Sequence, residues 1–214
     1  MMAKQPEIQL LVFRSASTEW DDAGRLQGKT DLPIGEGIAV SANQGVLGFV
    51  DALPGEMIAP ATVHCASDEA SRQTARMVAD AFGGGVKVKA VSGLSAMDFG
   101  LWEGLLGEEL EARYPRRYKG WREDPSSVLV PEGESFADGQ ARVLTTLAKL
   151  ADKANGSPVT AVLRPFEFAL LGALLDGRGP AAIWDVLEDG AVVIDRVVHR
   201  SVFRELLTTV RAVA

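Results

Sequence analysis

The chain has 214 residues, of which 47% are hydrophobic and 24% are charged, and its net charge is −7. This much apolar material can form a core without disulfides or a structural metal. The acidic balance excludes a basic surface for nucleic acid or for an anionic membrane. The single cysteine, Cys65, and the two histidines, His64 and His199, cannot supply a Cys- or His-built metal site. We therefore expect no metal and no cofactor.

The N-terminal segment Met1–Glu7 is polar, and no apolar run of the sequence is long enough to span a membrane. We therefore expect a soluble, cytoplasmic protein without a membrane partner. No repeat, low-complexity tract or linker divides the sequence, so residues 1–214 are expected to form a single domain.

Four short apolar runs have the length and composition of strands that are buried on both faces of a parallel sheet. They are Ile8–Phe13, Ala61–Ala66, Val86–Val91 and Val159–Leu163. Gly190–Val198 is expected to form a further strand.

Helical patterns lie between these runs. Apolar residues three and four apart predict a helix that ends near Phe82 and begins after Ser67 or Asp68, either of which can be the N-cap. The same spacing predicts a helix behind Ser135 and another over residues 165–175, where proline occupies the first helical position.

Two segments are less regular. Residues 106–124 are expected to form one polar inserted helix, with its basic residues at a solvated surface. Residues 202–210 have helical spacing, although their second half could also extend. Alternation of strands and helices predicts an α/β fold, a three-layer α-β-α sandwich around a mainly parallel sheet.

Ligands of such sheets bind outside the carboxyl ends of the strands, and the segments that follow these ends carry a series of motifs. They are R-S-A-S-T-E-W-D-D-A-G-R-L-Q-G-K-T-D-L-P at Arg14–Pro33, C-A-S-D-E-A-S-R-Q-T-A at Cys65–Ala75, L-S-A-M-D-F-G-L-W-E-G at Leu94–Gly104 and P-E-G-E-S at Pro131–Ser135. In order and spacing these segments resemble the histidine phosphatase superfamily, in its phosphoglycerate-mutase-like branch, most strongly over residues 8–175.

The resemblance implies a phosphohistidine mechanism whose central residues are replaced in this chain. The family nucleophile is the histidine of an R-H-G motif, and Ser15 occupies its position. The positions of the phosphate-clamping arginine, the proton-donating glutamate and the second histidine hold Ala70, Ala96 and Arg164. Only Arg14 of this central set is retained. A nucleophile must attack and then leave readily, and the transferring charge needs fixed donors, so these replacements remove the family chemistry.

We interpret the chain as a catalytically degenerate member of the family with a binding or regulatory role, and no catalytic residue is expected at these four positions. This interpretation leans against an enzyme. One alternative is a divergent phosphomonoesterase or other hydrolase with a remodelled active site, in which Ser15 is a candidate nucleophile. Another is a subunit of a hetero-oligomer without a small-molecule role. The expected partners are a weakly bound anion or phosphorylated small molecule, and a protein partner or a second copy of the chain.

A remnant anion pocket is expected at Arg14, Ser15, Asp21 and Arg164. Both arginines follow neighbouring strands of the family fold, so both should point toward the same site. Asp21 replaces a neutral asparagine of the family motif, and we expect it to pair with one of the two arginines and to fill part of the pocket. The loop contacts expected beside this pocket are Thr18, Gln27 and Gly28.

Other groups with reactive chemistry are expected to be structural. His64 and Cys65 alternate on one strand and should be packed on its opposite faces. His199 lies beyond the region of strong resemblance. Asp98 belongs to the retained D-F-G segment and is expected to support that segment.

Overall fold

The computed structural model describes residues 6–54 and 58–213, so that Met1–Gln5 of the polar N-terminal segment lie outside the description. The described residues form a five-stranded sheet in the order β3-β2-β4-β1-β5, whose strands are all parallel except β5, which is antiparallel to β1. The strands are β1 (Glu7–Arg14), β2 (Thr62–Cys65), β3 (Lys87–Ala90), β4 (Val159–Leu163) and β5 (Val193–His199). The predicted α/β fold with a mainly parallel sheet is confirmed.

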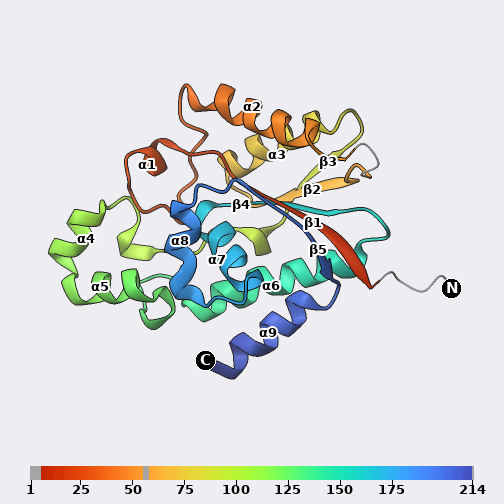
Figure 1. The fold of residues 1–214 in the computed structure, drawn as a ribbon. Helices are drawn as coiled ribbons and strands as arrows, with labels where there is room; N and C mark the ends of the chain where they lie inside the picture. Colours follow the sequence, from red (N-terminus) through yellow and green to blue (C-terminus); the bar gives the residue numbers. More distant parts are fainter. Residues whose placement is uncertain (1–5, 55–57, 214) are drawn as a thin grey trace.

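Helices cover both faces of the sheet (Figure 1). One face carries α2 (Ile38–Asp51) and α3 (Glu69–Ala81), and the other carries α6 (Phe136–Lys153), α7 (Pro165–Leu175) and α9 (Val202–Val213). The side chain of Asp68 caps α3, that of Ser135 caps α6, and Pro165 begins α7, as the sequence predicted. None of the helices in the described part of the chain has the length and apolar character needed to cross a lipid bilayer.

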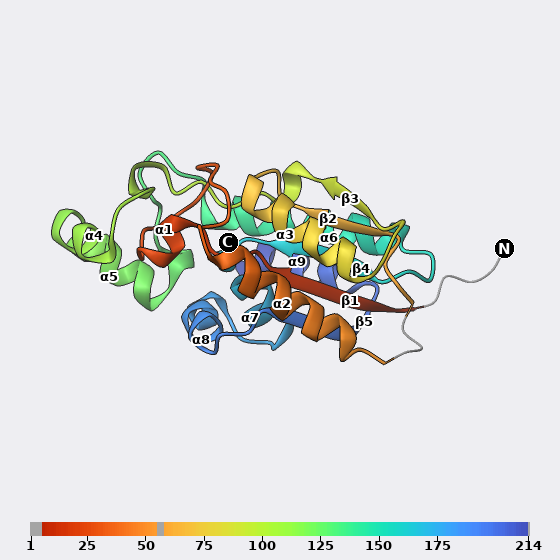
Figure 2. The same cartoon turned by 90° about the horizontal axis from the view of Figure 1, so that it is seen from above.

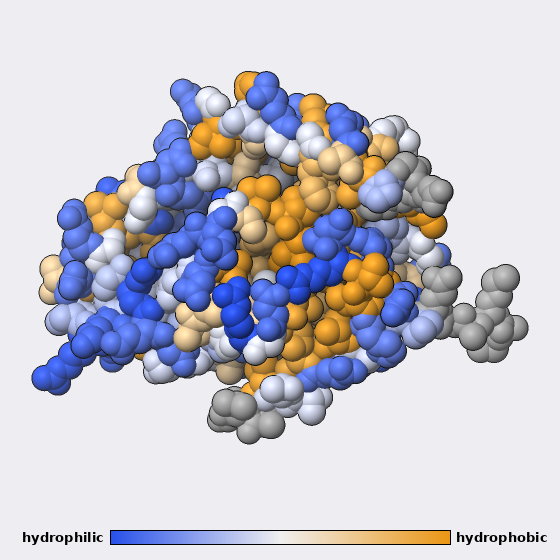
Figure 3. Space-filling model, viewed as in Figure 1, coloured by the Kyte–Doolittle hydropathy of each residue, from blue (hydrophilic) through white to orange (hydrophobic). Residues whose placement is uncertain are grey.

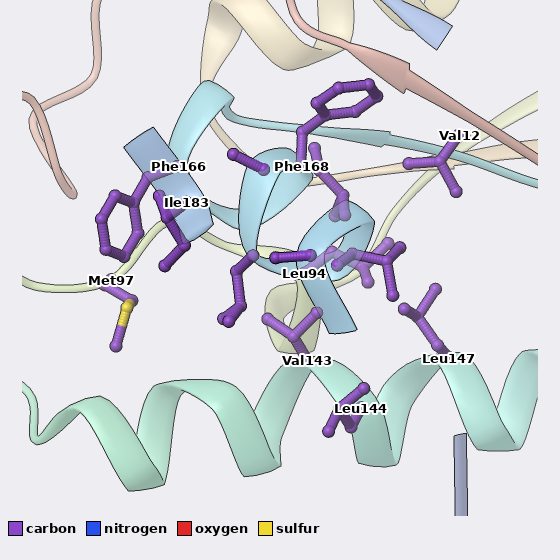
Figure 4. Close-up of a cluster of buried hydrophobic side chains, with 14 of the residues drawn as sticks. Val12, Leu94, Met97, Val143, Leu144, Leu147, Phe166, Phe168 and Ile183 are labelled. Carbon is purple, nitrogen blue, oxygen red and sulfur yellow. The ribbon is translucent and has the colours of Figure 1, made fainter. Parts of the chain in front are cut away.

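The central strand β1 is buried from both sides. Leu11 and Phe13 pack against the α2 and α3 side, whereas Leu10 and Val12 belong to the larger core on the α6 and α7 side. Figure 4 shows that larger core, where Val12 faces apolar side chains from α6 and α7. Because alternate residues of a strand point to opposite faces, a strand covered on both sides requires the nearly unbroken apolar run seen here.

The inserted segment differs from the prediction of one helix. It forms α4 (Gly107–Arg113) and α5 (Pro115–Glu123), which are separated at Pro115 because proline cannot continue the helical hydrogen bonding. Arg116, Arg117 and Lys119 are exposed, as expected. Trp121 is nevertheless buried, and its ring stacks on Phe166 of α7 at 5.9 Å between centroids. Together with α1 (Glu19–Asp22), these helices gather at the end of the sheet opposite the start of β1 (Figure 2).

Three other elements differ from the sequence expectations or were missing from them. The side chains of β3 are exposed rather than buried because β3 is an edge strand. The helix α2 was not predicted, since Gly45 and Gly48 weaken its helical pattern. The C-terminal segment, which could have extended, is the helix α9, and a short helix α8 (Ile183–Glu188) precedes β5.

Candidate active site

The carboxyl ends of β1 and β4 bring Ser15 and Arg164 together. The two strands are parallel neighbours with Arg14 opposite Leu163, and the backbone N–H of Ser15 donates to the carbonyl of Leu163 at 2.8 Å. The next residue of each strand end therefore lies at the same edge of the sheet. There the Arg164 guanidinium donates from Nη1 to Oγ of Ser15 at 3.0 Å.

Arg164 is buried, and both of its Nη atoms donate to side chains of the loop after β1, whereas its buried Nε has no partner within the described residues. Its side chain is 3% exposed, and its Nη2 contacts Oδ2 of Asp21 at 2.7 Å and Oε1 of Gln27 at 2.9 Å. The expected pairing of Asp21 with an arginine is thus confirmed, and Arg164 is the partner. A buried guanidinium needs such partners because an uncompensated charge in the interior is costly.

Thr18 holds Asp21 and Gln27 in place for this contact. Thr18 is fully buried, and its backbone N–H donates to Oδ2 of Asp21 at 2.8 Å in the capping box that begins α1. The Thr18 hydroxyl also donates to Oε1 of Gln27, and Nε2 of Gln27 donates to the Thr30 carbonyl at 2.9 Å. The predicted loop residues therefore position the partners of Arg164.

Gly28 is where this loop meets the D-F-G segment most closely. A Cβ atom at Gly28 would lie 2.3 Å from Oε1 of Glu103 and 2.4 Å from the carbonyl oxygen of Met97. The Glu103 carboxylate accepts the backbone N–H groups of Lys29 at 2.7 Å and Thr30 at 3.0 Å. A side chain at position 28 has no room because the loop and the carboxylate that caps it are in direct contact.

Arg14 is in a different situation from Arg164. Within the described residues its guanidinium has no hydrogen-bond or ion-pair partner, although the side chain is half-buried. Burial lowers the pKa of Arg14, and the negative charge of Asp21 acts in the opposite direction. Arg14 and Ser15 line a pocket of about 300 Å³ below α2. Of the two arginines in the predicted remnant anion pocket, Arg164 is thus hydrogen-bonded within the protein, and Arg14 is available to a ligand.

The positions assigned by resemblance to the clamp and the acid supply no polar side chain. Ala70 is fully buried in the first turn of α3, and Ala96 is 5% exposed. Ala96 borders an opening of about 380 Å³ that Asp68 and Arg72, at the start of α3, also line. It stays a prediction from the resemblance that these two positions, together with Ser15 and Arg164, correspond to the family's catalytic residues.

Glu167 is a buried acid that the sequence analysis missed. It is 1% exposed, its Oε1 accepts the backbone N–H of Met97 at 2.9 Å, and within the described residues its Oε2 has no partner. Burial raises the pKa of Glu167 to about 7, against the opposing effects of that backbone N–H and of Arg164 and Arg142. The signal was available, because Glu167 is the only charged residue in the otherwise apolar run of α7.

The remaining candidates lie away from this cluster or are inert. Burial raises the pKa of the Cys65 thiol to about 11, so it carries little thiolate at neutral pH. His64 is partly buried with Nδ1 3.3 Å from the Thr160 carbonyl, and burial lowers its pKa. His199 lies opposite Glu7 in the antiparallel register of β5 and β1, at the end of β1 that is far from the site. Asp98 accepts the backbone N–H of its own segment at Gly100, which is a structural role.

The fold and this sheet edge define a member of a known family: the chain belongs to the histidine phosphatase superfamily (branch 1), whose profile matches residues 10–197. It is 28% identical over 170 residues to phosphoserine phosphatase 1 of Hydrogenobacter thermophilus, which covers 77% of each chain. Among solved structures it resembles YhfR of Bacillus stearothermophilus with a TM-score of 0.71 and 23% identity, over 82% of this chain and 83% of that one. The chain also resembles a mycobacterial glucosyl-3-phosphoglycerate phosphatase, with a TM-score of 0.67 and 24% identity, over 82% of this chain and 85% of that one.

These relatives correct the functional interpretation drawn from the sequence. The hypothesis of a catalytically degenerate, binding or regulatory protein, and the leaning against an enzyme, are wrong, because the relatives named by an activity are phosphatases. The alternative of a divergent phosphomonoesterase agrees better with them. The degenerate interpretation gave the missing family residues more weight than the hydroxyl and the two guanidinium groups that remain at this edge.

Proposed function

We propose that the chain hydrolyses phosphate monoesters at a remodelled active site in which Oγ of Ser15 is the nucleophile. One observation carries the proposal: the Arg164 guanidinium donates to Oγ of Ser15 at 3.0 Å, and Ser15 lines the same pocket as Arg14, whose guanidinium has no hydrogen-bond partner among the described residues. The family membership and the phosphatase names of the relatives support the same class of reaction. The proposal requires no histidine and no metal ion.

The two arginines have separate tasks in this mechanism. Arg164 is fixed by Asp21 and Gln27, so its donation stabilises negative charge as it develops on the Ser15 oxygen. Arg14 has no protein partner among the described residues and is free to bind the non-bridging phosphoryl oxygens. Fixed donors aimed at developing charge are the main source of catalysis in phosphoryl transfer.

The reaction takes two steps. First, Oγ of Ser15 forms a bond to phosphorus as the bond from phosphorus to the ester oxygen breaks, and the serine proton passes by way of a phosphoryl oxygen to the leaving alcohol. A water molecule then attacks phosphorus, the Oγ–P bond breaks, and a proton of that water returns to Ser15. The net reaction converts an ester and water into an alcohol and inorganic phosphate. Because the serine oxygen is a poor leaving group, hydrolysis of the phosphoserine intermediate is slow, and this second step limits turnover.

The test is an assay of phosphate release from a panel of phosphomonoesters, combined with intact-mass analysis of enzyme quenched in acid. We expect turnover, a burst of alcohol release, and an acid-stable phosphoryl group on Ser15. The Ser15→Ala variant should lose both the turnover and the phosphoryl group. A label on a histidine, or a hydroxylamine-sensitive label on Asp21, would show that the nucleophile is wrong. Turnover that survives Ser15→Ala would place the reaction elsewhere, and no turnover on the panel would remove the proposed function.

A further inference from the structure

A pocket lies between α2 and the end of the sheet where β1 stops and β5 begins. Its volume is about 300 Å³, near the lower limit for small-molecule sites, and Phe13, Arg14, Ser15, Ala42, Gly45 and Val193 are among its lining residues. Figure 3 shows hydrophobic side chains gathered between α2 and β5 on this face of the molecule. The pocket therefore opens beside the reacting groups but on the α2 side, away from the opening at Ala96.

The pocket contains a single charged side chain. Arg14 is half-buried and has no partner within the described residues, so an anion bound here would gain its full attraction. Ser15, Ser17, Ser41 and Thr74 also line the cavity, and the hydroxyls of Ser41 and Thr74 are already hydrogen-bonded to backbone groups. No lysine, aspartate or glutamate lines it, so nothing in the pocket could neutralise a second charge on a ligand.

Apart from these hydroxyl-bearing residues, the walls away from Arg14 are apolar. Phe13 and Val46 are buried beneath the pocket, and Val193 borders it from the start of β5. On α2, Ala42 and Gly45 leave space, and a Cβ atom built at Gly45 meets no atom within 4 Å. Ala42 and Gly45 are therefore small enough to leave room for a short organic group beside Val46, which packs toward the sheet.

From this arrangement we infer that the pocket binds the organic part of the substrate, and that this part is small, largely apolar and uncharged. The inference rests on the proposed function and adds the substrate class to it. Arg14 takes the phosphoryl group, and the group esterified to it lies against α2. Phosphate esters of amino acids or carboxylic acids would be disfavoured, because burying their extra charges without partners is costly.

The test is calorimetric titration with alkylphosphonates, whose carbon–phosphorus bond the proposed reaction does not cleave. Each added methylene buried in the pocket should tighten binding about fourfold, so propylphosphonate should bind about fifteenfold more tightly than methylphosphonate. The phosphonate analogue of phosphoserine should bind more weakly than propylphosphonate. Arg14→Ala should weaken the binding of every phosphonate by about tenfold or more.

Two substitutions in α2 locate the binding site. Gly45→Leu places a side chain at the pocket and should abolish the preference for propylphosphonate over methylphosphonate. Gly48→Leu is the matched control, because Gly48 is also exposed on α2, has no atom within 4 Å of a built Cβ, and does not line the pocket. Both changes replace glycine by a better helix former, so they affect α2 itself alike.

The outcomes separate this inference from the proposed function. Chain-length preference that is lost in Gly45→Leu and kept in Gly48→Leu supports the inference, whether or not esters are hydrolysed. If no ester is hydrolysed but this pattern holds, the proposed function fails and the pocket remains a site for alkylated anions. Equal binding of methyl- and propylphosphonate, tighter binding of the phosphoserine analogue, or a preference that survives Gly45→Leu overturns the inference.

Discussion

Arg14 and Arg164 stand at the ends of two paired strands, yet the structure treats them in opposite ways. Arg164 is 2% exposed and donates to three side chains: Ser15, Asp21 and Gln27. Arg14 is half-buried beside a pocket and donates to none among the described residues. The Arg164 guanidinium is thus held in place by the loop after β1 while it donates to Ser15, whereas the Arg14 guanidinium remains available to a ligand. Stability and ligand binding should therefore respond to different arginines.

The largest effect is expected from Arg164→Ala. This change leaves the carboxylate of Asp21, whose side chain is 20% exposed, without its cation. Removing one member of a buried pair costs about 3–5 kcal/mol of unfolding free energy. Urea denaturation measures the loss, and adding Asp21→Asn should restore part of it by removing the orphaned charge. A loss below about 1 kcal/mol would show that Arg164 does not stabilise the fold more than Arg14 does.

Arg14→Ala should show the opposite pattern. We expect kcat/KM for phosphate esters to fall about 10²–10³-fold, the effect of losing one donor to the transition state. The unfolding free energy should change by about 0.5 kcal/mol or less, since the guanidinium has no hydrogen bond or ion pair to lose among the described residues. Arg14→Lys is the control, because it retains the charge but not the forked geometry, and should recover part of the activity. A stability loss as large as that of Arg164→Ala would contradict the comparison.

The buried carboxyl group of Glu167, three residues after Arg164, should make the unfolding free energy depend on pH. Its folded pKa, about 7, lies above its ordinary value of 4.5, so the folded state binds more protons between these values. Stability contributed by the protonated form is therefore complete below about pH 4.5 and is lost as pH rises through 7. The loss amounts to about 3 kcal/mol by pH 8. Glu167→Gln, which stays neutral, should flatten urea-denaturation midpoints between pH 5 and pH 8.

The control for this pH dependence is Asp98→Asn, since Asp98 is more exposed and lies outside the α7 turn. That variant should keep the decline of stability between pH 5 and pH 8. A decline that persists unchanged in Glu167→Gln would assign the titration to another group.

A smaller loss is expected from Gly28→Ala, in the loop that supports Gln27 beside Arg164. The added Cβ would lie 2.4 Å from the Met97 carbonyl, so the loop must shift, at about 1–3 kcal/mol. Thermal unfolding measures the loss. Gly84→Ala is the matched control, because a Cβ built at Gly84 meets no atom within 4 Å. The midpoint of its thermal unfolding should stay close to that of the parent protein. Equal midpoints for both variants would show that the loop adapts freely.

Local sequence was sufficient for most of the framework. The apolar run of β1 predicted a central strand because a strand covered on both faces cannot alternate with polar residues. Asp68, Ser135 and Pro165 marked the starts of α3, α6 and α7 because capping depends on residues within one turn. The resemblance to the family, rather than local sequence, implied that Arg14, Ser15 and Arg164 would lie at one edge of the sheet, and the parallel pairing of β1 and β4 places them there.

The sequence failed where local pattern and tertiary packing disagree. Residues 106–124 were predicted as one polar helix, but Pro115 divides them, and Trp121 is buried against α7 through contacts distant in sequence. The glycines of α2 concealed a helix that packing against the sheet stabilises. Counting family residues also suggested a protein without catalysis, which the phosphatase relatives contradict.

The sequence by itself determined which strands and helix starts would form, and its resemblance to the family predicted that Asp21 and two arginines would meet at the end of the sheet, where Asp21 would pair with one of them. Only the tertiary structure decided that Arg164 is the partner, that Arg14 faces a pocket below α2, and that Glu167 is buried against a backbone N–H 70 residues away in sequence. The reason is physical: residue type fixes which charges need partners, whereas the choice of partner depends on distances set by loops and helices packed from elsewhere in the chain.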